Sequence, residues 1–106
     1  MQFSNLMNAI PLTCVAGTIP SSFEGVYAGD LLSRAMSHVE GGNIWLTIMN
    51  NVNVIAVASL TEASAVILAE GVTLMPDAAA AAAEKNVCVL SSDLSVYELC
   101  CRIGAL

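Results

Sequence analysis

The sequence predicts a three-layer α/β domain in which helices cover a largely parallel sheet of about five strands. Short apolar runs alternate with helical segments along the 106 residues, and helices normally connect parallel strands in this way. The run at residues 44–49 is almost wholly apolar, β-branched or aromatic, which is typical of a strand buried on both faces. A chain of this length fits one domain, spanning residues 1–106.

The first predicted element is a helix over residues 2–10, where apolar residues recur at helical spacing until Pro11. Residues 12–16 then form a predicted strand that ends at Gly17. A turn-rich stretch follows, and residues 26–28 form a second short strand.

A helix is expected next over residues 31–39, before a pair of glycines. Asp30 is its expected N-cap, because an aspartate carboxylate can accept hydrogen bonds from first-turn amides. The apolar run at residues 44–49 supplies the following strand.

Residues 50–61 fit either of two periods. In one alternative Asn50 and Asn51 form a hairpin turn, and residues 52–58 return as an antiparallel strand. In the other an asparagine caps a helix that crosses to a strand over residues 65–69.

The second half continues the alternation of helix and strand. Pro76 and Asp77 open an alanine-rich helix that ends near residue 86. Residues 87–90 form the last predicted strand.

A final helix is expected over residues 94–103, and its apolar residues cover more than one narrow stripe. Three polar residues precede it as expected caps, namely Ser91, Ser92 and Asp93. Hydrophobic residues make up 57% of the chain and charged residues 11%, which exceeds what a monomer of this size can fully hide. The composition therefore predicts a homodimer, with part of the last helix facing the second subunit.

The net charge of −6 argues against two classes of partner. The only cations, Arg34, Lys85 and Arg102, are too scattered to bind nucleic acid or an anionic membrane surface. Four asparagines interrupt the uncharged stretch at residues 41–61, so no membrane-spanning helix is expected. No secretory signal is recognisable at the start, and a cytoplasmic location is expected.

No catalytic group, metal site or cofactor is predicted. The four cysteines, Cys14, Cys88, Cys100 and Cys101, lack the spacing of a zinc site and are expected to be small buried apolar residues. His38 is the single histidine, expected at the surface near a helix end, and no motif surrounds it.

Several segments resemble the DRTGG domain family, whose relatives sit beside the acyl-transfer domain of some phosphotransacetylases, accompany CBS domains, and are similar to the N-terminal domain of HPr kinase. The resemblance spans residues 26–103 and is carried by residues 25–33, 44–48, 53–60 and 87–99. It implies an HPr kinase N-terminal-domain-like fold. It also favours the helix for the ambiguous segment, because short stand-alone members of the family look helical there.

The sequence departs from the family at its name-giving string, because Asp-Arg-Thr-Gly-Gly does not occur. Ala69-Glu70-Gly71 stands where larger relatives have Thr-Gly-Gly, and residues 50–53 replace a Gly-Asp-Arg segment. The resemblance therefore implies a fold more strongly than a function.

Ligands of open α/β sheets gather beyond the carboxyl ends of the strands, where polar loops and helix N-termini are exposed. We expect a binding site there, formed from Gly29, Asp30, Thr47, Asn50, Asn51, Asn53, Ser91 and Ser92. Glu70, Gly71 and Asp93 belong to the same loops, and Thr47 with Asn53 is the expected functional pair.

The predicted function is a non-catalytic regulatory module that senses a small molecule, a nucleotide or another metabolite, or contacts a protein partner. The alternatives are a dimerising scaffold or subunit of a metabolic enzyme complex, and a small enzyme with an unrecognised site.

Overall fold

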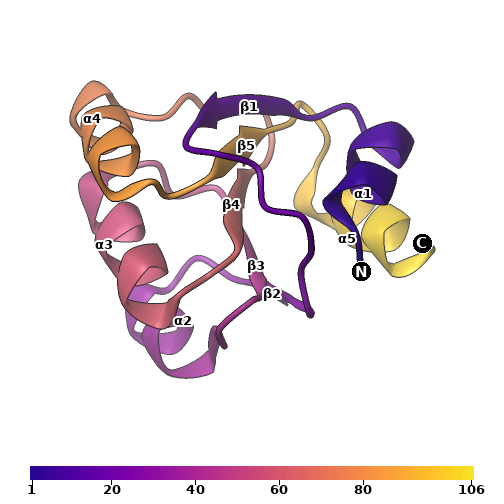
Figure 1. Ribbon diagram of the computed structural model, residues 1–106, viewed down its shortest axis with the longest axis horizontal. Helices are drawn as coiled ribbons and strands as arrows, with labels where there is room; N and C mark the ends of the chain where they lie inside the picture. The colour runs from indigo at the N-terminus through magenta and orange to yellow at the C-terminus, as the bar shows by residue number, and fades with distance from the viewer.

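The computed structural model describes residues 1–106 and contains a single five-stranded sheet with five helices. The strands are β1 (Thr13–Ala16), β2 (Val26–Ala28), β3 (Ile44–Thr47), β4 (Ala65–Leu68) and β5 (Val89–Ser91). The helices are α1 (Phe3–Ala9), α2 (Leu32–His38), α3 (Val52–Thr61), α4 (Pro76–Lys85) and α5 (Val96–Gly104). The strand order across the sheet is β1-β5-β4-β3-β2 (Figure 1).

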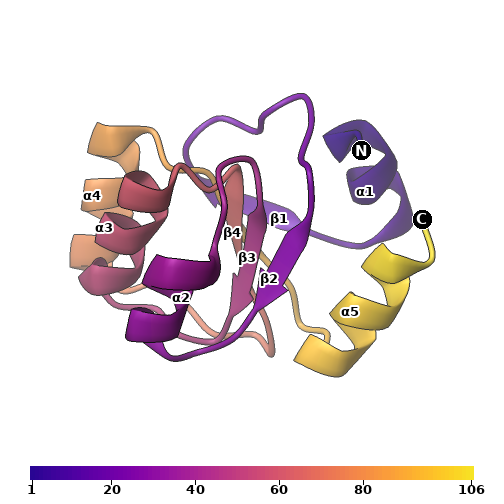
Figure 2. The ribbon, with the colours of Figure 1, turned by 90° about the horizontal axis from the view of Figure 1, so that it is seen from below.

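The sheet is parallel except at one edge. Strands β2, β3, β4 and β5 run in the same direction, and β1 pairs antiparallel with β5. Helices α2, α3 and α4 cover one face, whereas α1 and α5 cover the other (Figures 1 and 2). The predicted three-layer α/β fold with a largely parallel sheet is confirmed.

The central strands are buried on both faces, as the almost wholly apolar run in β3 predicts. Ile44 and Leu46 join the core beneath α1 and α5. Trp45 points into the opposite core, beneath α2, α3 and α4. Its indole Nε1 donates a hydrogen bond to the carbonyl of Gly29 at 2.9 Å, so the buried ring leaves no polar atom without a partner.

The ambiguous segment after β3 is helix α3, so the helical alternative is confirmed and the hairpin is wrong. Asn51 is the N-cap, and its Oδ1 accepts from the backbone N–H of Asn53 at 3.0 Å. Strand β4 lies parallel to β3, and a parallel neighbour requires a crossover connection rather than a tight turn.

Two predicted N-caps are wrong. Helix α2 is preceded by Leu31, which provides no side-chain cap, while Asp30 bonds to the end of β3 instead. Helix α5 is capped by Ser95, whose Oγ accepts from Glu98 N–H at 3.1 Å. Before α5 several adjacent polar residues could cap the helix, whereas Asp30 is the single polar candidate before α2 and is bonded to Thr47 and Ile48 instead.

The last strand begins two residues later than predicted, at Val89, and extends to Ser91. Its start follows from the end of α4, where Asn86 adopts a left-handed conformation with φ of 52°. Val87 N–H still donates to the carbonyl of Ala82 in α4 at 2.9 Å, and the carbonyl of Cys88 is the first to accept from β4, from Val66 N–H at 2.9 Å.

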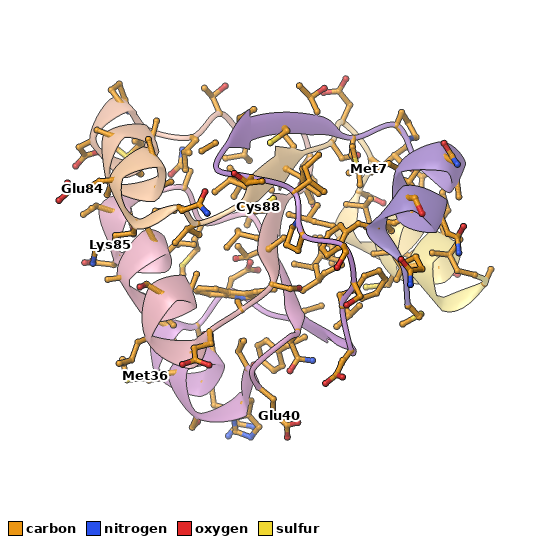
Figure 3. The ribbon with its side chains drawn as sticks, viewed as in Figure 1. Met7, Met36, Glu40, Glu84, Lys85 and Cys88 are labelled. Atoms are coloured by element: carbon orange, nitrogen blue, oxygen red, sulfur yellow. The ribbon has the colours of Figure 1, made fainter.

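The prediction for the cysteines is wrong for three of the four. Cys14, Cys100 and Cys101 are exposed, and only Cys88 is buried. Cys88 is labelled in Figure 3. Burial raises the pKa of the Cys88 thiol to about 12, and Cys14 adds to the rise through electrostatic repulsion and a hydrogen bond. Cys88 therefore stays protonated at neutral pH and is a poor nucleophile.

His38 lies exposed in the last turn of α2, as predicted. None of the helices combines the length and the apolar character needed to span a bilayer. No group of three or more His, Cys, Asp or Glu side chains is placed to hold a metal ion.

Candidate functional site

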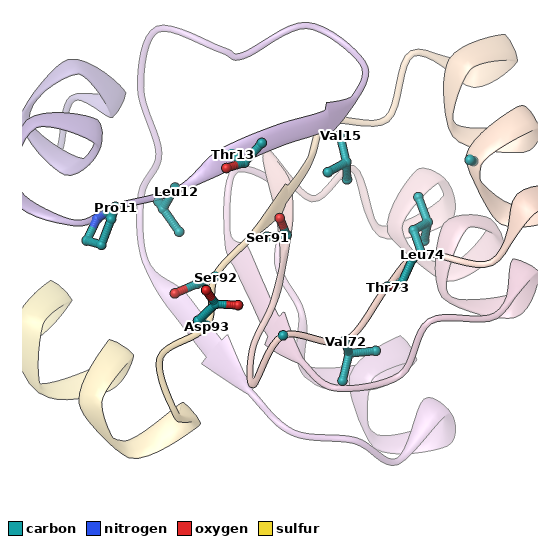
Figure 4. A pocket seen from close by; sticks show the side chains of 12 residues that line it. Pro11, Leu12, Thr13, Val15, Val72, Thr73, Leu74, Ser91, Ser92 and Asp93 are labelled. Atoms are coloured by element: carbon teal, nitrogen blue, oxygen red, sulfur yellow. The ribbon is translucent and has the colours of Figure 1, made fainter.

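A cavity of about 500 Å³ opens at the carboxyl ends of β4 and β5. Three chain segments and one residue of α4 surround it (Figure 4). They are the start of β1 with Pro11, Leu12, Thr13 and Val15; the loop after β4 with Gly71, Val72, Thr73 and Leu74; the end of β5 with Ser91, Ser92 and Asp93; and Ala79. The lining therefore combines hydroxyl groups and one carboxylate with aliphatic walls.

The antiparallel strand β1 contributes one wall because of its direction. Thr13 pairs with Ser91, the last residue of β5. The beginning of β1 thus lies beside the carboxyl end of β5, whereas a parallel partner would end there. The segment around Pro11 and Leu12 is brought to the cavity by this pairing.

Two successive residues in the left-handed region shape the loop after β4. Glu70 has φ of 61° and Gly71 has φ of 69°. Their N–H groups donate to the carbonyls of Leu94 and Ser92, both at 2.9 Å. These bonds fasten the loop after β4 to the loop after β5.

Asn50 supports the wall that the loop after β4 forms. Its Nδ2 donates to the carbonyl of Thr73 at 2.7 Å, and its own carbonyl accepts from Met75 N–H at 3.1 Å. The residue holds the loop in place without lining the cavity.

The predicted site residues fall into two groups. Ser91 and Ser92 line the cavity together with Gly71 and Asp93, which lie in loops that the sequence also indicated. Those that do not line it are Gly29, Asp30, Thr47, Asn50, Asn51 and Asn53.

Thr47 and Asn53 do not form a pair in the structure. Thr47 is fully buried, and its hydroxyl donates to Asp30 Oδ1 at 2.7 Å. The same oxygen of Asp30 accepts from Ile48 N–H at 3.0 Å, and Thr47 Oγ1 accepts from Met49 N–H at 3.2 Å. Thr47 and Asp30 thus fix the turn after β3, while Asn53 lies exposed in the first turn of α3.

Eight of the twelve lining residues were not predicted from the sequence. Residues of β1 and the loop at 72–74 carried no polar motif, and nothing local shows that β1 is antiparallel to β5. The Glu70-Gly71 corner was the available signal, because a glycine after a buried strand often marks a sharp change of direction.

An apolar groove of about 290 Å³ runs beside the edge strand β2 and helix α5. Its lining consists of Met1, Val26, Ala28, Cys100, Ile103, Gly104 and Leu106. A further cavity of about 370 Å³ lies at the amino ends of the strands and includes Lys85 and Cys88.

The fold and the carboxyl-edge cavity define a small three-layer α/β domain with polar loops gathered at one edge of a parallel sheet. A solved structure of the CBS and DRTGG domains of the regulatory region of Clostridium perfringens pyrophosphatase, in complex with its activator diadenosine tetraphosphate, is similar to this chain. The TM-score is 0.74 at 13% sequence identity, and the match covers 96% of this chain and 45% of that one. The DRTGG-like fold implied by the sequence resemblance is confirmed.

No protein-family model and no curated protein matches the sequence. The chain spans less than half the length of the pyrophosphatase regulatory region, 45%. The similarity to the solved structure therefore establishes the fold of this chain alone.

Proposed function

We propose that residues 1–106 form one DRTGG-like regulatory module that binds a small polar molecule in the carboxyl-edge cavity. The cavity of about 500 Å³ carries the proposal, because it lies where ligands of parallel α/β sheets bind and has the size of a small-molecule site. The structurally similar pyrophosphatase region is regulatory and was solved with an activator bound, which supports the same role for this chain.

A non-catalytic role is supported by the chemistry of the lining. Asp93 is the only ionisable side chain that lines the cavity, and no cysteine, histidine or lysine lies beside it there. The ring of His38 contacts the Ser37 hydroxyl and the carbonyl of Arg34, both on α2 and outside the lining. A general base with an orienting partner is thus not assembled at the site.

A cytoplasmic location is part of the proposal. Cys14, Cys100 and Cys101 are exposed and unpaired. Exposed thiols persist in the reducing cytoplasm, whereas oxidising compartments convert them to disulfides.

Filling the cavity is expected to abolish ligand binding. Ala79 lines it from α4, and Ala79→Leu places a branched side chain in the space where a ligand sits. In a thermal-shift screen of nucleosides, nucleotides and acyl metabolites, a ligand at about 100 times its Kd stabilises the wild type by about 2.7 kcal/mol, a shift of several degrees. Ala79→Leu is expected to lose this shift.

Ala80→Leu is the matched control, because Ala80 is exposed on the same helix and does not line the cavity. It should retain the ligand-induced shift. If no compound stabilises the wild type, or if Ala79→Leu responds like Ala80→Leu, the proposed binding function is wrong. A dimeric protein that binds no metabolite would favour the scaffold function.

We also propose that the module forms a homodimer through the groove beside β2. Strand β2 is a sheet edge that pairs only with β3, and edge strands offer unpaired backbone groups to a second strand. The groove is apolar, and exposed Tyr97 adds further apolar surface on α5. A second copy would cover surface that the excess of apolar residues leaves exposed.

Cys100→Lys is expected to convert the dimer to a monomer, because Cys100 lines the groove and a lysine there would bury a charge at the interface. The neighbouring Cys101 is exposed and does not line the groove, so Cys101→Lys should leave the dimer intact. Sedimentation velocity at micromolar concentration measures both variants. A monomeric wild type, or equal behaviour of the two variants, would refute this interface.

A further inference from the structure

The chain's cations all lie away from the carboxyl-edge cavity. Arg34, Lys85 and Arg102 are its only arginine and lysine residues, and none lines the cavity. Lys85 borders the cavity at the amino ends of the strands, and Arg102 lies 4.0 Å from Glu98 on α5 (Lys85 is labelled in Figure 3). A phosphate group bound here would meet no positive side chain, although phosphate sites in proteins usually contain one.

The three backbone amides at the corner after β4 are also committed. Glu70, Gly71 and Val72 all donate their N–H groups to carbonyls within the protein. A run of left-handed residues can form an anion-binding nest only when its amides point outward unpaired. This corner therefore does not provide one.

Helix α4, which begins beside the cavity, does not make up for the missing positive charge. Asp77 is in the first turn of α4, and its Oδ1 accepts from Ala78 N–H at 2.9 Å. This carboxylate already occupies the position in which a bound anion gains most from the helix dipole. Asp93, in the lining itself, repels an anion further, and the net charge of −6 has the same sign.

The polar groups of the lining suit an uncharged ligand that is rich in hydrogen-bond donors. The hydroxyls of Thr13 and Ser91 and the carboxylate of Asp93 can accept hydrogen bonds from sugar hydroxyls or from the amino group of a base. Leu12, Val72 and Leu74 supply apolar surface for a flat ring (Figure 4). A volume of about 500 Å³ is sufficient for one nucleoside.

We propose that this cavity binds an unphosphorylated nucleoside and discriminates against the phosphate esters of the same nucleoside. The inference rests on the proposed binding function and specifies its ligand. It makes this module differ in ligand chemistry from the solved pyrophosphatase region, whose activator carries four phosphates.

The test is isothermal titration of the full chain with adenosine, guanosine, cytidine and uridine, each beside its 5′-monophosphate, and with diadenosine tetraphosphate. At least one nucleoside is expected to bind about tenfold or more tightly than its own monophosphate. Asp93→Asn removes the opposing charge and should narrow that ratio by about threefold or more. Glu84→Gln makes the same change in charge at an exposed position near the end of α4, outside the lining, and should leave the ratio close to that of the wild type.

Monophosphates or diadenosine tetraphosphate that bind as tightly as the nucleosides would overturn this inference and leave the regulatory binding function standing. A metabolite that binds in the cavity while all four nucleosides fail at millimolar concentration would overturn it in the same way. If nothing binds, both proposals fail. The comparison of nucleoside with monophosphate uses the wild-type protein, so it stands even if Asp93→Asn is poorly folded.

Discussion

Gly17→Ala is expected to lower the free energy of unfolding by at least about 3 kcal/mol, and the melting temperature by about 12 °C or more. Gly17 follows β1 with φ of 72°, a conformation that costs an alanine about 1–2 kcal/mol. An added Cβ would lie 2.4 Å from the carbonyl oxygen of Val87 and 2.8 Å from Cα of Cys88. These are backbone atoms, so no side-chain rotation relieves the overlap.

The chain around Gly17 has little room to move away. Ala16 pairs with Val89 on one side, and Thr18 N–H donates to Asn86 Oδ1 at 3.1 Å on the other. Separation of β1 from β5 is the remaining way to accommodate the methyl group, and it would also open one wall of the cavity. Chemical denaturation followed by circular dichroism measures the loss of stability.

Gly41→Ala provides the control for this substitution. The φ of Gly41 is not positive, and a Cβ there would come no closer than 4.0 Å to any heavy atom outside its chain neighbours. This variant is expected to match the wild type or to gain up to about 1 kcal/mol from the reduced freedom of the unfolded chain. Equal stability of the two alanine variants would show that the contact of Gly17 with Val87 and Cys88, just before β5, does not constrain the fold.

The layers of the fold could be predicted because each central strand carries its own signal. In β3 and β4 every residue is buried, and the almost wholly apolar runs in the sequence predict that burial directly. The helical nature of α3 could not be read from its period, because the exposed Val52, Ala56 and Leu60 are apolar as well as the buried residues of the helix. The helix was predicted from the family resemblance instead.

The details of the turns could not be predicted, because several neighbouring side chains offer the same chemistry. Ser91, Ser92 and Ser95 are all competent caps for α5, and only the position where β5 ends selects Ser95. Asp30 likewise fits the pattern of a cap. Its hydrogen bond from Thr47 depends on the pairing of β2 with β3, which brings the two strand ends together.

The location of the candidate site was predictable only in part. The carboxyl edge follows from a parallel sheet alone, and Ser91 and Ser92 were identified on that basis. The cavity, however, is displaced toward β5, because β1 closes it from a direction that local sequence does not encode. Gly29, Asp30 and Thr47 share the edge but lie at the other end of the strand order.

Asp30→Ala is expected to cost about 2 kcal/mol of stability, and to leave ligand binding in the cavity unchanged. Asp30 is exposed, yet its Oδ1 takes bonds from both the Thr47 hydroxyl and the Ile48 amide. Without the carboxylate the Thr47 hydroxyl remains buried with no acceptor in Asp30, and such a group costs about 1–3 kcal/mol. Thermal melts of the variants, together with titrations of ligand, measure the two effects separately.

A double-mutant cycle with Thr47→Val separates this network from other roles of Asp30. The cost of Asp30→Ala and Thr47→Val together should be smaller than the sum of the single costs, because each change removes the same bond. Asp30→Asn should retain most of the stability, since an amide oxygen can still accept from Thr47 and Ile48. If Asp30→Ala instead left stability within about 0.5 kcal/mol of the wild type and weakened ligand binding, Asp30 would belong to the binding site. In that case the loop residues predicted from the sequence would be ligand contacts.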